Sequence, residues 1–211
     1  MSYQARTVRA TTATGFNIAV AGALLGVLLS AAPGQAAEIP WRSGAFDVPT
    51  RTPAEIATVL EAFAARDGAA RHVVVQFDGP VDDDMRAMLA AEGLELLAYV
   101  GANSYFAAVT PGRVDAGALS ATRALLGVEA IQPAWKLHPL LSTGRAPAWA
   151  IVTADSDPIV GAYVVFHADV SLATGIARAE ELGATVRDAL DTVNALVIEL
   201  PQSAIAQLVA D

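Results

Sequence analysis

Three histidines are the side chains in this sequence best suited to acid–base or metal chemistry. His72, His138 and His167 stand far apart, and none has a partner three or four positions away. Two metal ligands on one face of a helix need that spacing, so the sequence contains no helical metal-binding pair. His72 opens one predicted strand and His167 closes another, which favours strand-end or surface positions. We therefore predict no metal ligand among the histidines.

Two acidic clusters could suggest a calcium site, but their spacing favours structural roles. Asp82, Asp83 and Asp84 are consecutive, whereas a calcium loop places its ligands on alternate residues around a central glycine. Carboxylates in the first turn of a helix interact favourably with the helix dipole, and we prefer that interpretation. Asp155 and Asp157 belong to the sequence Asp-Ser-Asp-Pro at residues 155–158, which indicates a turn.

The remaining chemistry is limited by what the sequence lacks. It has no cysteine, which excludes disulfides, thiolate metal sites and cysteine nucleophiles. It has no Gly-x-Ser-x-Gly elbow and no phosphate-binding glycine loop. Tyr99, Tyr105 and Phe106 could form a stacking platform, but 13 Lys+Arg against 22 Asp+Glu make a poor nucleic-acid binder. We interpret these aromatics as core and sheet face, and we predict no catalytic residue and no cofactor.

The N-terminus predicts export. Arg6 and Arg9 precede an apolar run at residues 16–29, and a small-x-small pattern ends at Ala36. This is the layout of a secretory signal peptide, with cleavage after Ala36 or Ala37. The alternative is a membrane anchor, but the run is shorter than the roughly 20 residues that span a bilayer. We expect a secreted or periplasmic protein that is not held in a membrane after cleavage.

A hairpin at residues 93–109 organises the rest of the chain. Glycine, strand, turn and returning strand follow one another, and the same order recurs ninety positions later. An ungapped alignment places Gly183 on Gly93 and Leu196 on Phe106. A hairpin repeated with the same flanks predicts two copies of one small module.

Local signals around the first hairpin predict a β-α-β-β-α-β order preceded by one helix. Thr52 and Glu55 form a capping box at the start of that helix. The other elements of the first copy are expected at residues 71–77 (strand), 81–92 (helix), 114–126 (helix) and 128–137 (edge strand). Such an order is that of the ferredoxin-like fold.

The second copy repeats this order only in part. A strand at residues 161–166, a helix from Leu172 to Leu182 and the second hairpin are followed by a helix after Pro201. Nothing corresponds to the strand at 128–137, as if the chain were cut short. In the expected 4-1-3-2 strand order, residues 163–166 would then lie at an unprotected edge.

The predicted fold class is α+β, with two tandem ferredoxin-like modules of which the second lacks its last strand. The expected segments are a signal peptide (1–36), a lead-in with an extra helix (37–70), the first module (71–140), a linker (141–159) and the truncated second module (160–211).

The pattern resembles the N-terminal pro-region of bacterial subtilisin-like serine protease precursors. Members of that group often open their first unit like H-V-V-V-Q-F-D-G-P (residues 72–80) and close it like L-L-G-V-E-A-I-Q-P-A-W-K-L (residues 125–137). The resemblance implies an intramolecular chaperone and peptidase inhibitor whose sheet packs on the protease while its tail occupies the active-site cleft. The partner would be a subtilisin-like catalytic domain, in cis in a precursor or otherwise in trans. None of the family's three catalytic segments occurs here, so no residue is predicted to be catalytic.

Two alternatives remain open at this level. The second hypothesis, after the propeptide, is a free-standing exported ferredoxin-like module that binds a protein or a small ligand. A third interpretation is an enzyme whose site these motifs do not capture.

Overall fold

A computed structural model describes residues 37–41, 44–65, 71–144 and 146–210. Within them the protein is a mixed α+β structure with two four-stranded antiparallel sheets. The predicted signal peptide, residues 1–36, lies outside the described residues, whereas Ala37 is the first residue inside them. The expected cleavage position therefore falls at the start of the described chain.

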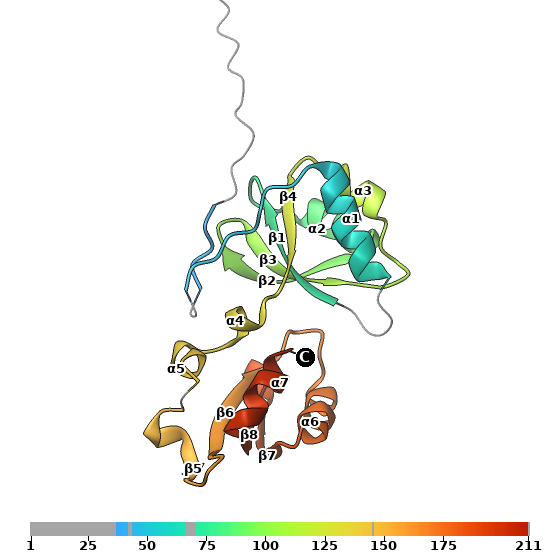
Figure 1. The fold of residues 1–211 in the computed structure, drawn as a ribbon. Helices are drawn as coiled ribbons and strands as arrows, with labels where there is room; N and C mark the ends of the chain where they lie inside the picture. The colour runs from blue at the N-terminus through green and yellow to red at the C-terminus, as the bar shows by residue number, and fades with distance from the viewer. Residues whose placement is uncertain (1–36, 42–43, 66–70, 145, 211) are drawn as a thin grey trace, which may run out of the picture. The chain divides into compact units, whose positions relative to one another are not determined.

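The first sheet has the strand order β2-β3-β1-β4 (Figure 1). Its elements are α1 (Pro53–Ala64), β1 (Arg71–Phe77), α2 (Asp83–Ala91), β2 (Leu94–Gly101), β3 (Ser104–Val109), α3 (Ala116–Ser120) and β4 (Leu125–Ala130). Alternate residues of β1 and β3 pack with the helices into the main core. That core includes Ile56 and Leu60 of α1, Leu89 of α2 and Leu119 of α3.

Local signals position the first two helices as predicted. Thr52 Oγ1 accepts a hydrogen bond from the Glu55 amide, and Glu55 Oε2 accepts one from the Thr52 amide, which completes the capping box at α1. Gly93 ends α2 with φ +84°, a conformation that suits glycine. A Cβ there would lie 2.7 Å from the Arg113 carbonyl carbon, so glycine also permits a close backbone contact.

The lead-in covers the other face of the first sheet. Ile39 and Phe46 form an isolated antiparallel bridge, and together with Val48 they bury Val74 of β1. The indole of Trp135 stacks on Phe46 with ring centroids 4.0 Å apart. Both faces of this sheet are therefore covered, one by helices and the other by the lead-in.

The second sheet has the strand order β5-β6-β8-β7. The elements in and around it are α4 (Pro133–Lys136), α5 (Pro139–Ser142), η1 (Ala148–Ala150), β5 (Ile151–Thr153), β6 (Ile159–Val165), α6 (Leu172–Glu181), β7 (Thr185–Leu190), η2 (Asp191–Val193), β8 (Ala195–Pro201), η3 (Gln202–Ala204) and α7 (Ile205–Ala210). One face packs under α6 and α7, where Leu196, Ile198 and Leu200 meet Ile176 and Leu208. Ser171 caps α6 as predicted.

The prediction that the second sheet lacks a fourth strand is wrong in its strand count. β5, from the segment predicted to be a linker, pairs with the start of β6 through Ile151↔Val160 and Thr153↔Ile159. Three residues are too few to cover all of β6, and residues 161–165 have no strand partner on that side within the described part of the chain. The predicted open edge is thus shortened but not closed.

Two predicted boundaries around the first sheet are also wrong. The helix predicted at 114–126 is only α3, because Leu125 and Val128 pair with β1 and their burial there outweighs local helix propensity. The strand predicted at 128–137 is β4, which begins earlier and ends at Ala130. Pro133 is not an edge-strand proline but opens α4, a position that needs no amide donor.

The ungapped alignment of the two hairpins holds for the first strand of each but is wrong by one residue for the second. Leu96 pairs with Ala107 and Val186 pairs with Ile198, so β2 and β7 keep the predicted shift of 90. Phe77 N donates to Asn103 O, and Phe166 N donates to Asn194 O, so Asn194 corresponds to Asn103 with a shift of 91. Leu196 then matches Tyr105, and both face the helices of their sheets. A slip of one residue reverses the face of every side chain in a strand.

No helix among the described residues is both long and apolar enough to cross a bilayer.

Candidate functional site: an uncovered face of the second sheet

The second sheet has one face without helices, which we call the bare face. It is formed by the side of β6 that carries Tyr163 and Val165, by Val197 of β8, and by Val152 of β5. A Cβ on Gly161 would lie 3.8 Å from Val152 Cγ2, which places Val152 beside β6 on this face. The helix-packed face takes the alternate residues of the same strands.

Comparison with the first sheet shows how unusual this exposure is. The hydrogen bonds that align the hairpins make Tyr163 the counterpart of Val74 and Val165 the counterpart of Gln76. Val74 is 0% exposed and Gln76 is 1% exposed beneath the lead-in, whereas Tyr163 is 72% exposed and Val165 is 69% exposed. No described segment covers the bare face of the second sheet in the way that the lead-in covers the equivalent face of the first sheet.

An ion pair borders the apolar part of the bare face. Arg187 of β7 binds Glu199 of β8 through Nη2 and Oε2. The hydrogen bond from Arg187 holds the pKa of Glu199 below its usual value. Both charges are at the surface, where such pairs contribute little to stability. The face therefore consists of exposed apolar side chains with one charged pair at the side, a composition suited to contact with another protein.

The sequence did not single out this face. The segment from Gly161 to Phe166 is apolar at almost every position, so period-two alternation could not separate its two sides. A tyrosine within that run was the available signal, since its hydroxyl favours a partly polar environment. The local signals that predicted an open edge here indicated the right strand but not its exposed face.

The structure brings together two histidines that the sequence treated as unrelated. His72 Nε2 lies 2.9 Å from both carboxylate oxygens of Asp169, and its ring stacks on that of His167 at 4.2 Å between centroids. Burial, and then His72, lowers the pKa of His167 to about 4, against the opposing effect of Asp169. Stacked rings do not converge their nitrogens on one point, and no metal-binding cluster occurs among the described residues. His138 instead accepts from Leu140 N at the start of α5.

The acidic clusters have the structural roles that the sequence predicted. Asp82 caps α2 by accepting from Met85 N at 2.8 Å, with Asp83 and Asp84 in the first turn. Asp157 accepts hydrogen bonds from the amide and hydroxyl of Ser203, which lower its pKa.

The predicted aromatic cluster divides between core and surface. Tyr105 is in the main core and Phe106 faces the lead-in, while Tyr99 stays exposed with its ring centroid 5.2 Å from that of Tyr105. Arg86 lies over the Tyr105 ring, 5.4 Å from its centroid.

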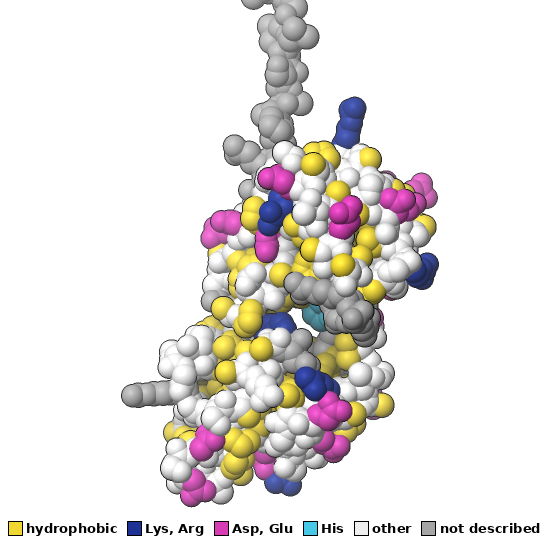
Figure 2. All heavy atoms as spheres, turned by 45° about the vertical axis from the view of Figure 1, so that its right-hand side comes forward, with side chains coloured by type: hydrophobic (Ala, Val, Ile, Leu, Met, Phe, Trp, Pro, Cys, Tyr) yellow, Lys and Arg dark blue, Asp and Glu magenta, His cyan; other side chains and the backbone are white. Residues whose placement is uncertain are grey.

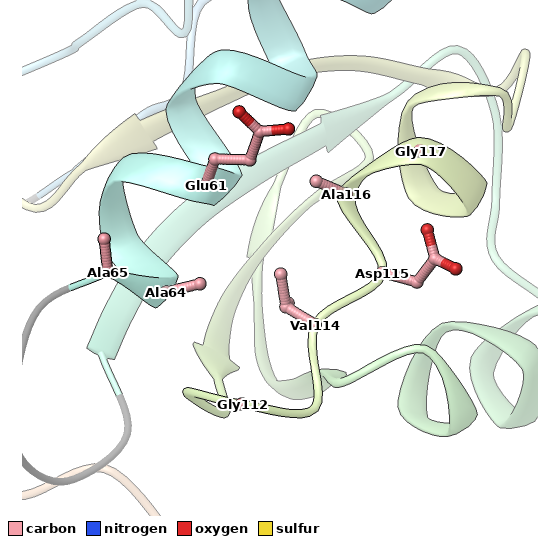
Figure 3. A pocket seen from close by; sticks show the side chains of 8 residues that line it. All are labelled: Glu61, Ala64, Ala65, Gly112, Val114, Asp115, Ala116 and Gly117. Atoms are coloured by element: carbon pink, nitrogen blue, oxygen red, sulfur yellow. The ribbon is translucent and has the colours of Figure 1, made fainter.

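One hollow in the described surface is lined by few side chains that could do chemistry. It lies between the end of α1 and the segment before α3, and Figure 3 shows it lined mostly by alanine and glycine. Its two carboxylates belong to Glu61 and Asp115, and Asp115 already caps α3 by accepting from Ala118 N. On the face drawn in Figure 2, Lys and Arg side chains are scattered among Asp and Glu and form no broad basic patch.

Comparison with known proteins adds one match. No curated protein and no solved structure matches this chain. Residues 40–134 match a domain of unknown function, DUF8729, a range that runs from the lead-in into α4 and so includes both the first sheet and the segment that covers it.

Proposed function

We propose that this chain is the propeptide-like region of a secreted subtilisin-like serine endopeptidase, acting as its folding chaperone and inhibitor. The observation that carries the proposal is the bare face, an apolar sheet surface left open beside a sheet whose equivalent surface is covered. In the family that the sequence resembles, a pro-region packs its sheet on the protease. Within the described part of the chain, the bare face is an exposed sheet surface that could make such a contact.

The proposal includes a ferredoxin-like fold for each module. Two features support it: the element order β1-α2-β2-β3-α3-β4, and the strand order β2-β3-β1-β4 with β1 and β3 at the centre. In the second sheet, β6 and β8 take the central positions and β5 occupies the outer position next to β6. Export through residues 1–36 is part of the same proposal, because a pro-region of this kind accompanies a secreted enzyme.

The energetic argument rests on the apolar side chains of the bare face. Moving an exposed valine into a protein interface contributes about 1.5–3 kcal/mol before the costs of association. Val165 and Val152 are 69% and 52% exposed, and Tyr163 adds a larger apolar ring with a hydroxyl. Of these side chains, Tyr163 is of a type that is enriched in interface hot spots.

A refolding experiment tests the proposal. A denatured bacterial subtilisin-like catalytic domain is diluted into buffer with and without this protein, and recovered activity is measured on a chromogenic peptide. We expect the protein to increase the recovery and the double variant Tyr163→Ser, Val165→Ser to lose this effect. Tyr99→Ser is the matched control, because Tyr99 is an exposed tyrosine on the first sheet. Circular dichroism checks that all variants are folded.

The outcome also separates the two main interpretations. No gain in recovered activity at any ratio of the two proteins would contradict the propeptide proposal. The free-standing exported binding module, with a partner other than a protease, would then be the better interpretation of the bare face.

A further inference from the structure

One buried polar side chain in the first sheet is only half satisfied. Gln76 of β1 is 1% exposed and lies on the side of the sheet that the lead-in covers. Its Nε2 donates to Ala37 O at 2.7 Å and to Ala102 O at 3.1 Å. Its Oε1 is buried and has no hydrogen-bond partner among the described residues.

The orientation of this amide follows from its neighbours. Two carbonyl oxygens face the nitrogen, so the reverse orientation would place Oε1 against both of them. An unsatisfied buried acceptor is unfavourable and rare in folded proteins. Gln76 Oε1, in the side chain that already binds Ala37, can therefore accept a hydrogen bond from one more donor.

Ala37 stands at the position where the sequence predicts signal-peptide cleavage. Cleavage after Ala36 would keep the Ala37 carbonyl that Gln76 binds, whereas cleavage after Ala37 would remove it. Cleavage after Ala36 also puts Gly34 and Ala36 at the two positions where signal peptidase prefers small residues. The contact between Gln76 and Ala37 and the small-residue motif thus both favour cleavage of the Ala36–Ala37 bond.

We propose that the exported protein begins at Ala37 and that Gln76 binds its new α-amino group. Hydrolysis of the Ala36–Ala37 bond consumes one water and leaves a carboxylate on Ala36 and an ammonium group on Ala37. The peptide N–H of the uncut chain has one donor in a fixed plane, whereas the ammonium group has three donors that rotate. It belongs to the same residue as the carbonyl that Gln76 already holds, and the proposal requires one of its donors to point at Oε1. Processing would then complete the hydrogen bonds of Gln76 and fix the lead-in on the first sheet.

This inference rests on the proposed export but can fail separately from it. N-terminal sequencing of the exported protein should begin at Ala37. A start at Glu38 or at a later residue would overturn the binding of the α-amino group while leaving export intact. An intact Met1 in the membrane fraction would contradict export itself.

A second measurement uses the folded protein without relying on export. Two forms are compared, one beginning at Ala37 and one extended by Ala36, and the folding equilibrium constant of each is measured by urea titration. A hydrogen bond from a charged donor predicts that the form beginning at Ala37 has a constant larger by about tenfold. In Gln76→Met the difference between the two forms should disappear, because the acceptor is gone. Equal constants for the two forms with Gln76 in place would overturn the proposal, and this comparison does not depend on how well the Met variant folds.

Discussion

Replacing Gly127 by alanine should push the lead-in away from β4 and destabilise the first module. A Cβ at this position would lie 2.4 Å from Pro49 O and 2.9 Å from Val48 Cγ1. A contact with a backbone oxygen cannot be relieved by a side-chain rotation, so the lead-in would have to move by about 1 Å. The Arg51 N to Leu126 O hydrogen bond, now 2.9 Å, is next to this point and would be stretched.

The expected cost follows from these contacts. Overpacking of a buried site costs about 1–3 kcal/mol, and a weakened backbone hydrogen bond adds about 1 kcal/mol. The better strand propensity of alanine over glycine returns about 0.5–1 kcal/mol. We therefore expect Gly127→Ala to lower the free energy of unfolding of the first module by about 1–3 kcal/mol.

Urea denaturation followed by tryptophan fluorescence measures this change, because Trp41 of the lead-in packs edge-on against Phe106 of β3. Gly79→Ala is the matched control: a Cβ there meets nothing within 4 Å, so its midpoint should equal or slightly exceed that of the wild type. A double-mutant cycle with Val48→Ala adds a second criterion. Val48 is fully buried, and its truncation should cost less once Gly127→Ala has displaced it. If Gly127→Ala and Gly79→Ala unfold at the same urea concentration, the close packing of the lead-in on β4 is refuted.

Three further predictions concern pH, capping and catalysis. The pKa of His167 is lowered to about 4, so between pH 6.5 and 4 the unfolded chain binds more protons than the folded one. The contribution of His167 to the free energy of unfolding should be constant above pH 6.5 and fall by about 1–2 kcal/mol as the pH drops to 4, after allowance for the partial exposure of the ring. His167→Gln should therefore flatten this part of a profile of melting temperature against pH. An unchanged profile would contradict the burial argument. Thr52→Ala should destabilise α1 by about 1 kcal/mol through loss of its N-cap, measured by chemical denaturation, with Thr58→Ala on the same helix as a non-capping control. Purified protein should hydrolyse neither casein nor small esters, since the catalytic segments of subtilases are missing; turnover that a single Ser or Asp substitution abolishes would reveal an overlooked active site.

Local sequence determined the features whose physical cause is local. The capping box at Thr52, the cap at Ser171 and the carboxylates before α2 were predictable because each hydrogen bond joins residues three positions apart. The positive-φ glycine after α2 and its counterpart Gly183 after α6 belong to the same class. These features placed the helices and hairpins in the right order.

Only the tertiary structure decided which face of each strand is buried. The segment from Gly161 to Phe166 is apolar on both sides, so its pattern could not show which side is buried, and in the second hairpin the ungapped alignment gave β8 the wrong register. The packing of α6 on Leu196 and Ile198 selects the register, and it leaves Tyr163 and Val165 on the opposite side. The same holds for β5: a three-residue strand has too little pattern to be predicted, and it exists because β6 offers it an unpaired edge. Exposure of the bare face is thus a property of how distant segments pack, since the first sheet has a lead-in to cover the equivalent surface and the described part of the second has none.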